Sequence, residues 1–157
     1  MVRGEHKPRL WLVCFTNGDG HAWWDRLLRP GFRHVCAASY YADVGAWVLV
    51  DSTRTGLVVE VVPPDGFDGR MAQLVRDSAA ILRVPSAEGR SRAEFHAGWC
   101  VGTVKSLLGL NSRALAPFGL YRHLLAIGAE VVEIPRLDEP VQDAQRPEGR
   151  PGDHCPA

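Results

Sequence analysis

The chain has 157 residues, of which 46% are hydrophobic and 23% are charged, and its 18 basic and 18 acidic residues cancel. This length and composition predict one soluble globular domain with a sizeable core. The neutral balance favours neither nucleic acid nor an anionic membrane as a partner. No run approaches the roughly 18 apolar residues of a membrane span, and no signal-peptide pattern opens the chain, so we expect a cytoplasmic location.

The N-terminal half predicts strands joined by short turns. Apolar runs rich in strand-forming residues are bounded by glycine-containing turns, and a short helix falls between the first two runs. The turn Ala42-Asp43-Val44-Gly45 joins the second and third runs as a hairpin. The expected elements are strands at 9–15, 32–41, 46–51 and 56–62 and a helix at 21–28.

The C-terminal half predicts mainly helices. Pro63-Pro64-Asp65-Gly66 is expected to stop the fourth strand, and Pro117 to open a helix, where its missing N–H costs little. The expected elements are helices at 69–79, 99–108 and 117–127 and strands at 80–85 and 129–134. This order is typical of an α+β fold with an antiparallel sheet. We expect a single domain over residues 8–135 and a disordered tail over 136–157, which has almost no apolar residues.

Cys100 is the residue around which a chemical function can be built. It stands where a glycine-bearing turn meets an apolar helix, and the N–H groups and dipole of a helix N-terminus stabilise a thiolate. The chain also contains Cys14, Cys36 and Cys155, without a CxxC pair, so we expect free thiols and no metal site.

A nucleophilic cysteine needs a base and a group that orients the base. His34 lies in an otherwise apolar strand, and Asp51 ends the next strand, where its carboxylate could accept the His34 Nδ1–H. The hairpin register decides whether they meet. A turn at 43–45 places Asp51 opposite Ala37, whereas a turn at 41–44 places it opposite His34, and a bulge or a two-residue turn could also restore the parity.

Each of these residues also has an ordinary structural explanation. Cys100 shares a helix face with Val104 and Leu107 and could simply pack in the core. A strand histidine can be a satisfied core group, and an aspartate at the end of a strand commonly opens a turn. The catalytic hypothesis therefore depends on the three residues occurring together.

A hairpin with a histidine, then an acidic residue, then a helix that opens with cysteine resembles the circularly permuted branch of the NlpC-like papain-fold hydrolases, which includes lecithin:retinol acyltransferase-like proteins. Residues 99–110, 116–125 and 128–131 are similar to that family's cysteine helix, following helix and closing strand. Trp99 precedes the cysteine, where the family pattern has an Asn-Cys pair.

The resemblance implies that Cys100 is the nucleophile, that His34 is the general base and then the acid, and that Asp51 orients it. The Cys100 N–H would belong to an oxyanion hole, with Asn17 or His21 as a second donor unless these residues cap the loop. The reaction would form an acyl-enzyme from an amide, ester or thioester, without metal or cofactor. The substrate would be a small molecule, peptide or glycopeptide with a carbonyl centre.

Two alternatives remain open from the sequence. A non-catalytic interaction or assembly protein, of a phage or bacterial system, could keep the same fold without the reaction. The tryptophans could line an apolar or glycan-binding cleft or pack in the core and its rim; they are Trp11, Trp23, Trp24, Trp47 and Trp99.

Overall fold

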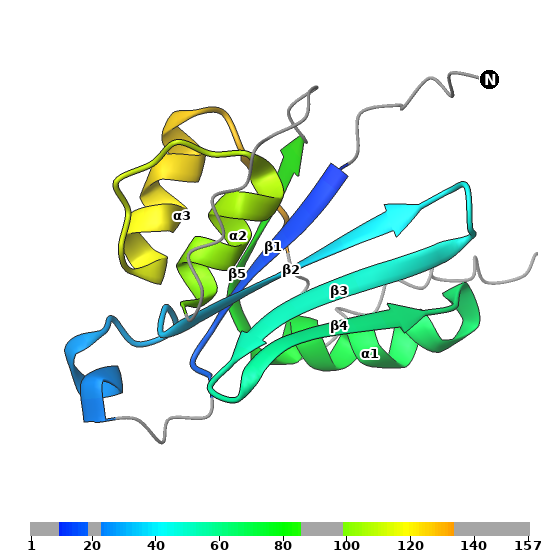
Figure 1. Cartoon of the computed structure of the whole chain (residues 1–157), viewed down its shortest axis with the longest axis horizontal. Coiled ribbons are helices and arrows are strands. Elements are labelled where there is room, and N and C mark those ends of the chain that lie inside the picture. The colour runs from blue at the N-terminus through cyan, green and yellow to red at the C-terminus, as the bar shows by residue number, and fades with distance from the viewer. Residues whose placement is uncertain (1–9, 19–22, 86–98, 134–157) are drawn as a thin grey trace, which may run out of the picture.

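The fold is a six-stranded antiparallel sheet with helices on both faces, as seen in a computed structural model (Figure 1). The structure describes residues 10–18, 23–85 and 99–133. The elements are β1 (Leu10–Thr16), the 3-10 helix η1 (Trp23–Leu27), β2 (His34–Tyr41), β3 (Ala46–Thr53), β4 (Gly56–Val62), α1 (Pro64–Asp77), β5 (Ser78–Pro85), α2 (Cys100–Leu108), α3 (Pro117–Ala126) and β6 (Glu130–Val131). The predicted α+β class with an antiparallel sheet is confirmed, and the expected tail lies outside the described residues.

The first strand of the chain lies inside the sheet, whose order is β4-β3-β2-β1-β5-β6. β1 pairs with β2 on one side, with Cys14 opposite Cys36 and Thr16 opposite His34. It pairs with β5 on the other side, with an irregularity between Phe15 and Thr16. β2, β3 and β4 form a meander, so the two hairpins that follow β1 occupy one half of the sheet.

The two faces of the sheet carry separate apolar clusters because side chains alternate along each strand. On one face, Phe15 and Val35 pack with Val104 of α2 and Leu120 of α3. On the other face, Cys14 and Cys36 pack with Leu74 of α1. Figure 1 shows the corresponding layers, with α2 and α3 together and α1 alongside β3 and β4.

α1 begins five residues before the predicted helix. Pro63 and Pro64 stop β4 at Val62 as predicted, but Pro63 is also the extended N-cap of α1 and Pro64 is its first residue. Proline suits that position because its fixed φ is helical and the N–H it lacks would have no helical partner. The predicted end at Ala79 was also wrong, since Ser78 and Ala79 already belong to β5.

The other helices keep close to their predicted bounds. α2 ends at Gly109, whose φ of 66° lies in the left-handed region and ends the helix. Leu120 and Leu124 of α3 are buried, whereas Ile127, which follows the helix, is exposed. The last strand is shorter than expected. None of the helices in the described ranges is both long and apolar enough to cross a membrane.

Candidate active site

Cys100 is the first residue of α2. Trp99 before it is extended and exposed, and its carbonyl accepts the N–H of Thr103 at 3.1 Å, which closes the first turn of the helix. The N–H of Cys100 itself is one of the first four of the helix, which have no partner within it. The half-buried thiol therefore lies at the positive end of a helix, as the sequence predicted.

His34 is held at the start of β2 by the end of β1. It lies opposite Thr16, whose carbonyl accepts the Arg33 N–H at 2.9 Å. Gly18 passes close to it: a Cβ on Gly18 would lie 3.0 Å from the His34 Cβ, and the φ of Gly18 is 61°. The close approach and the positive φ both require glycine at position 18. The loop after β1 therefore packs against the Cβ of His34 and helps to fix the position of this side chain.

His34 and Asp51 form a direct pair. The His34 Nε2 lies 2.6 Å from the Asp51 Oδ1, and the two side chains are 21% and 36% exposed. The turn that aligns them occupies residues 42–45, with Tyr41 opposite Ala46. Neither predicted register is present, because extending the observed ladder would put Asp51 opposite Cys36. Asp51 is thus a diagonal neighbour of His34 on the same face of the sheet.

The prediction that Asp51 accepts the Nδ1–H of His34 was wrong. The carboxylate bonds Nε2 instead. Diagonal neighbours on antiparallel strands are about 7–8 Å apart, and Nε2 is the ring nitrogen farther from Cβ, so only that side of the ring spans the gap. Because Asp51 bonds Nε2, Nδ1 is the ring nitrogen that remains available for a second interaction.

The thiol of Cys100 also interacts with His34. Burial opposes protonation of His34, but hydrogen bonds with Asp51 and with Cys100, together with the charge interactions with both, outweigh it and raise the pKa of His34 from 6.5 to about 10. The imidazole is therefore protonated at neutral pH. The structure thus brings together all three residues that the sequence singled out.

Cys36 was missed as a neighbour of this site. It is buried opposite Cys14, and a hydrogen bond with Cys14, burial and the negative charge of Asp51 all raise the pKa of its thiol. The positive charge of His34 lowers this pKa, but the raising effects are larger, so the thiol is neutral. The signal was available, because Cys36 follows His34 by two residues and so shares its strand face. Cys14, Cys36 and Cys100 are free, and Cys155 lies outside the described residues.

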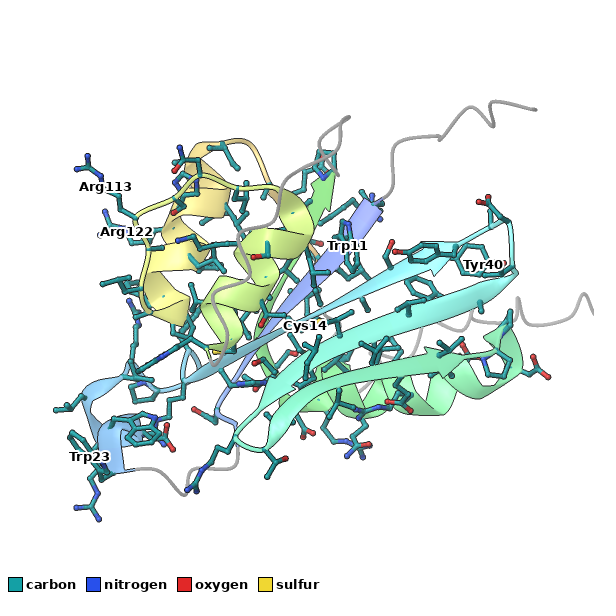
Figure 2. The ribbon with its side chains drawn as sticks, viewed as in Figure 1. Trp11, Cys14, Trp23, Tyr40, Arg113 and Arg122 are labelled. Atoms are coloured by element: carbon teal, nitrogen blue, oxygen red, sulfur yellow. The ribbon has the colours of Figure 1, made fainter. Side chains whose placement is uncertain are left out.

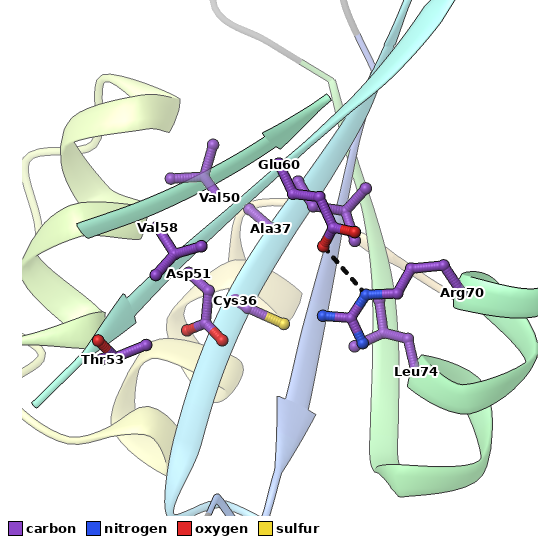
Figure 3. Close-up of a pocket in the computed structure, with 10 residues that line it drawn as sticks. Cys36, Ala37, Val50, Asp51, Thr53, Val58, Glu60, Arg70 and Leu74 are labelled. Carbon is purple, nitrogen blue, oxygen red and sulfur yellow. Dashed lines mark hydrogen bonds and ion pairs between the residues drawn. The ribbon is translucent and has the colours of Figure 1, made fainter. Parts of the chain in front are cut away.

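A cleft of about 260 Å³ lies between the β3–β4 hairpin and α1 (Figure 3). Asp51 and Cys36 line it together with Leu74, and the ion pair of Arg70 with Glu60, 3.1 Å long, crosses it. Cys100 and His34 do not line this cleft. Asp51 therefore contacts His34 on one side and the cleft on the other.

The weaker candidates contribute less. The Asn17 Oδ1 accepts the Gly31 N–H at 2.6 Å, so this side chain caps its loop, as the ordinary explanation proposed. His21 lies outside the described residues. The tryptophans do not form one cleft, since Trp11 is buried in the core whereas Trp23 is exposed at the far end of the molecule (Figure 2).

Two further results concern metal binding at the site and the similarity of the chain to known proteins. Within the described ranges, no three His, Cys, Asp or Glu side chains are grouped so that they could hold a metal ion. No protein-family model matches the sequence, and comparison with curated proteins and with solved structures gave no match.

Proposed function

We propose that this protein is a thiol-dependent hydrolase or acyltransferase of the permuted papain-like type, with Cys100 as nucleophile, His34 as proton carrier and Asp51 as the group that orients His34. One observation carries the proposal: the His34 Nε2 lies 2.6 Å from the Asp51 Oδ1, and the same imidazole interacts with the Cys100 thiol at the first position of α2. Cysteine nucleophiles share this logic of nucleophile, base and orienting group.

Because the pKa of His34 is raised, its imidazole already carries a proton at the start of the proposed reaction. In the proposed reaction protonated His34 lies beside the Cys100 sulfur, and the thiolate is the form of cysteine that acts as a nucleophile. The sulfur attacks a carbonyl carbon, and the C–O, C–S or C–N bond to the leaving group breaks as that group takes the proton from His34. Neutral His34 then accepts a proton from water or an acceptor alcohol, which attacks the thioester and releases Cys100 as the thiolate.

The helix start stabilises the charge that forms on the carbonyl oxygen. The N–H of Cys100 has no partner within α2 and lies next to the sulfur along the chain, as an oxyanion donor requires. The Asp51 carboxylate holds the ring through Nε2, which leaves Nδ1 as the ring nitrogen available for proton transfer in the proposed reaction.

A second candidate is a binding protein that performs no reaction. It is favoured by the position of the cleft, which opens along α1 and does not include Cys100. In this case the His34–Asp51 pair would act only to hold the β2–β3 hairpin together. The two candidates differ in whether Cys100 is activated.

The test is alkylation of the folded protein by iodoacetamide at pH 6.5, with each cysteine followed by mass spectrometry. We expect fast modification of Cys100, none in Cys100→Ala, and a rate at least about tenfold lower in His34→Ala, because loss of the imidazolium removes the charge that stabilises the thiolate. His123→Ala, on the half-exposed face of α3, is the matched control and should react like the wild type.

Turnover is tested with small activated amide, ester and thioester probes. We expect an acyl adduct on Cys100 whose formation needs His34. Equal alkylation rates in wild type and His34→Ala, with no acyl adduct from any probe, would establish the binding-protein alternative instead.

A further inference from the structure

β4 is an edge strand with exposed apolar residues on both of its faces. Within the described residues it pairs only with β3, so every second residue directs its backbone N–H and C=O groups away from the sheet. Its sequence is Gly-Leu-Val-Val-Glu-Val-Val. Leu57, Val58, Val59 and Val61 are 45%, 48%, 55% and 64% exposed.

Three of these side chains form a stripe, which we call the β4 stripe: Leu57, Val59 and Val61. Val59 lies opposite Val50, which belongs to the core beneath α2 and α3. The β4 stripe therefore lies on the sheet face that carries these helices. α2 packs on β2 and β3, and Figure 1 shows α2 and α3 lying away from β4, which leaves the stripe uncovered by them.

The edge lacks the usual protection against pairing with another strand. Natural edge strands carry lysine, proline, inward-pointing charges or bulges that prevent such pairing. β4 has a single charged residue, Glu60, and Arg70 of α1 bonds it at 3.1 Å. No net charge is therefore left on the strand to repel an identical strand.

The order of residues makes β4 complementary to itself. If two copies pair antiparallel about Val59, each Leu57 lies opposite Val61 of the second copy and the two Val59 side chains lie opposite each other. The stripe is then apolar along its whole length. Glu60 lies opposite Val58 of the second copy, so the two glutamates do not face each other, and aliphatic cross-strand pairs add to the main-chain hydrogen bonds.

We propose that the occupant of the β4 edge is a second copy of this chain. The two β4 strands pair antiparallel about a two-fold axis that passes midway between the two Val59 residues. The result is one continuous sheet through both protomers, with the two β4 stripes side by side on one face. Such a C2 contact uses the same patch on both partners. A seven-residue strand pair is a small interface, so we expect a reversible, concentration-dependent dimer.

The test is sedimentation velocity of the full chain over a range of concentrations. We expect the wild type to dimerise, and Val59→Lys and Val59→Glu each to remain monomeric, because the two-fold axis sets like charges opposite each other. An equimolar mixture of the two variants should form a heterodimer, since the introduced lysine of one copy then faces the introduced glutamate of the other. Circular dichroism verifies that both variants are folded, as expected for a side chain that is 55% exposed.

The matched control is Leu115→Lys, which places the same charge at an exposed apolar residue in the loop before α3. It should dimerise like the wild type. A wild type that stays monomeric up to millimolar concentration would overturn the proposal. So would a dimer that Leu115→Lys disrupts as strongly as Val59→Lys, or variants that fail to recombine when mixed.

Discussion

The pKa of His34 is clearly shifted by its surroundings in the candidate site. Its ring lies between a carboxylate and a thiol, and the two hydrogen bonds outweigh the cost of burying a charge. The sequence indicated His34 and Asp51 because a polar group in an apolar strand needs a partner. It could not indicate which ring nitrogen bonds the carboxylate, since that depends on a diagonal separation set by the turn at 42–45.

Stability should decrease with pH in a defined window. The pKa of His34 is raised on folding, so its contribution to the free energy of unfolding is fully present below pH 6.5 and is lost as the pH rises through about 10. Because the Asp51 side chain is 36% exposed, solvent screening limits the effect to the order of 1 kcal/mol.

The measurement is urea denaturation between pH 5 and 10.5 for the wild type, His34→Gln and Asp51→Asn. The difference in the free energy of unfolding between wild type and His34→Gln should shrink across this window, and Asp51→Asn should move the change toward pH 6.5. Parallel curves for all three proteins would mean that His34 is not protonated in the way the structure indicates.

At the scale of elements, local sequence patterns predicted the existence of the strands and helices better than the residues at which they begin and end. Apolar runs between glycine-containing turns gave β1 to β4, because turn residues and strand formers act over a few neighbours. The start of α1 was missed because Pro63-Pro64 was assigned only to the end of β4, although it also opens the helix. Leu74 of α1 packs against the sheet, a contact that no local pattern contains.

The left-handed end of α2 allows a paired substitution test. Gly109→Ala should destabilise the protein by about 1 kcal/mol, because its φ of 66° is unfavourable for any residue with a Cβ. Gly119→Ala, inside α3, should instead stabilise by up to about 1 kcal/mol, since the new Cβ meets only Ala114 at an ordinary 3.6 Å and helical alanine is favoured over glycine.

Thermal unfolding of the two variants decides the comparison. Melting temperatures that move in opposite directions, by about 2–4 °C per kcal/mol for a chain of this size, are expected. A stable Gly109→Ala protein would show that the end of α2 is free to adopt another conformation.

At the scale of the whole molecule, the candidate site is assembled from segments distant in sequence. The β2–β3 hairpin supplies His34 and Asp51, and α2 brings Cys100 against it through the core that contains Val104 and Val35. The sequence indicated this convergence through a cysteine at the start of a helix and a histidine and an aspartate in neighbouring apolar strands. The face of the sheet that receives each helix, and the position of the cleft along α1, depend on the strand order and could not be derived from local patterns.

Because Cys14 is buried in β1, the rate at which a reagent modifies its thiol reports how often the middle of the sheet opens. β1 has a bonded neighbour on each side, and the Cys14 side chain is completely buried, so a reagent reaches this sulfur only after the middle of the sheet has opened. With excess thiol reagent, Cys14 should react at a rate set by the opening free energy, far more slowly than Cys100. Site-resolved mass spectrometry during native-state thiol exchange measures both rates in one sample, and equal rates would show that the central strands are not the most persistent part of the fold.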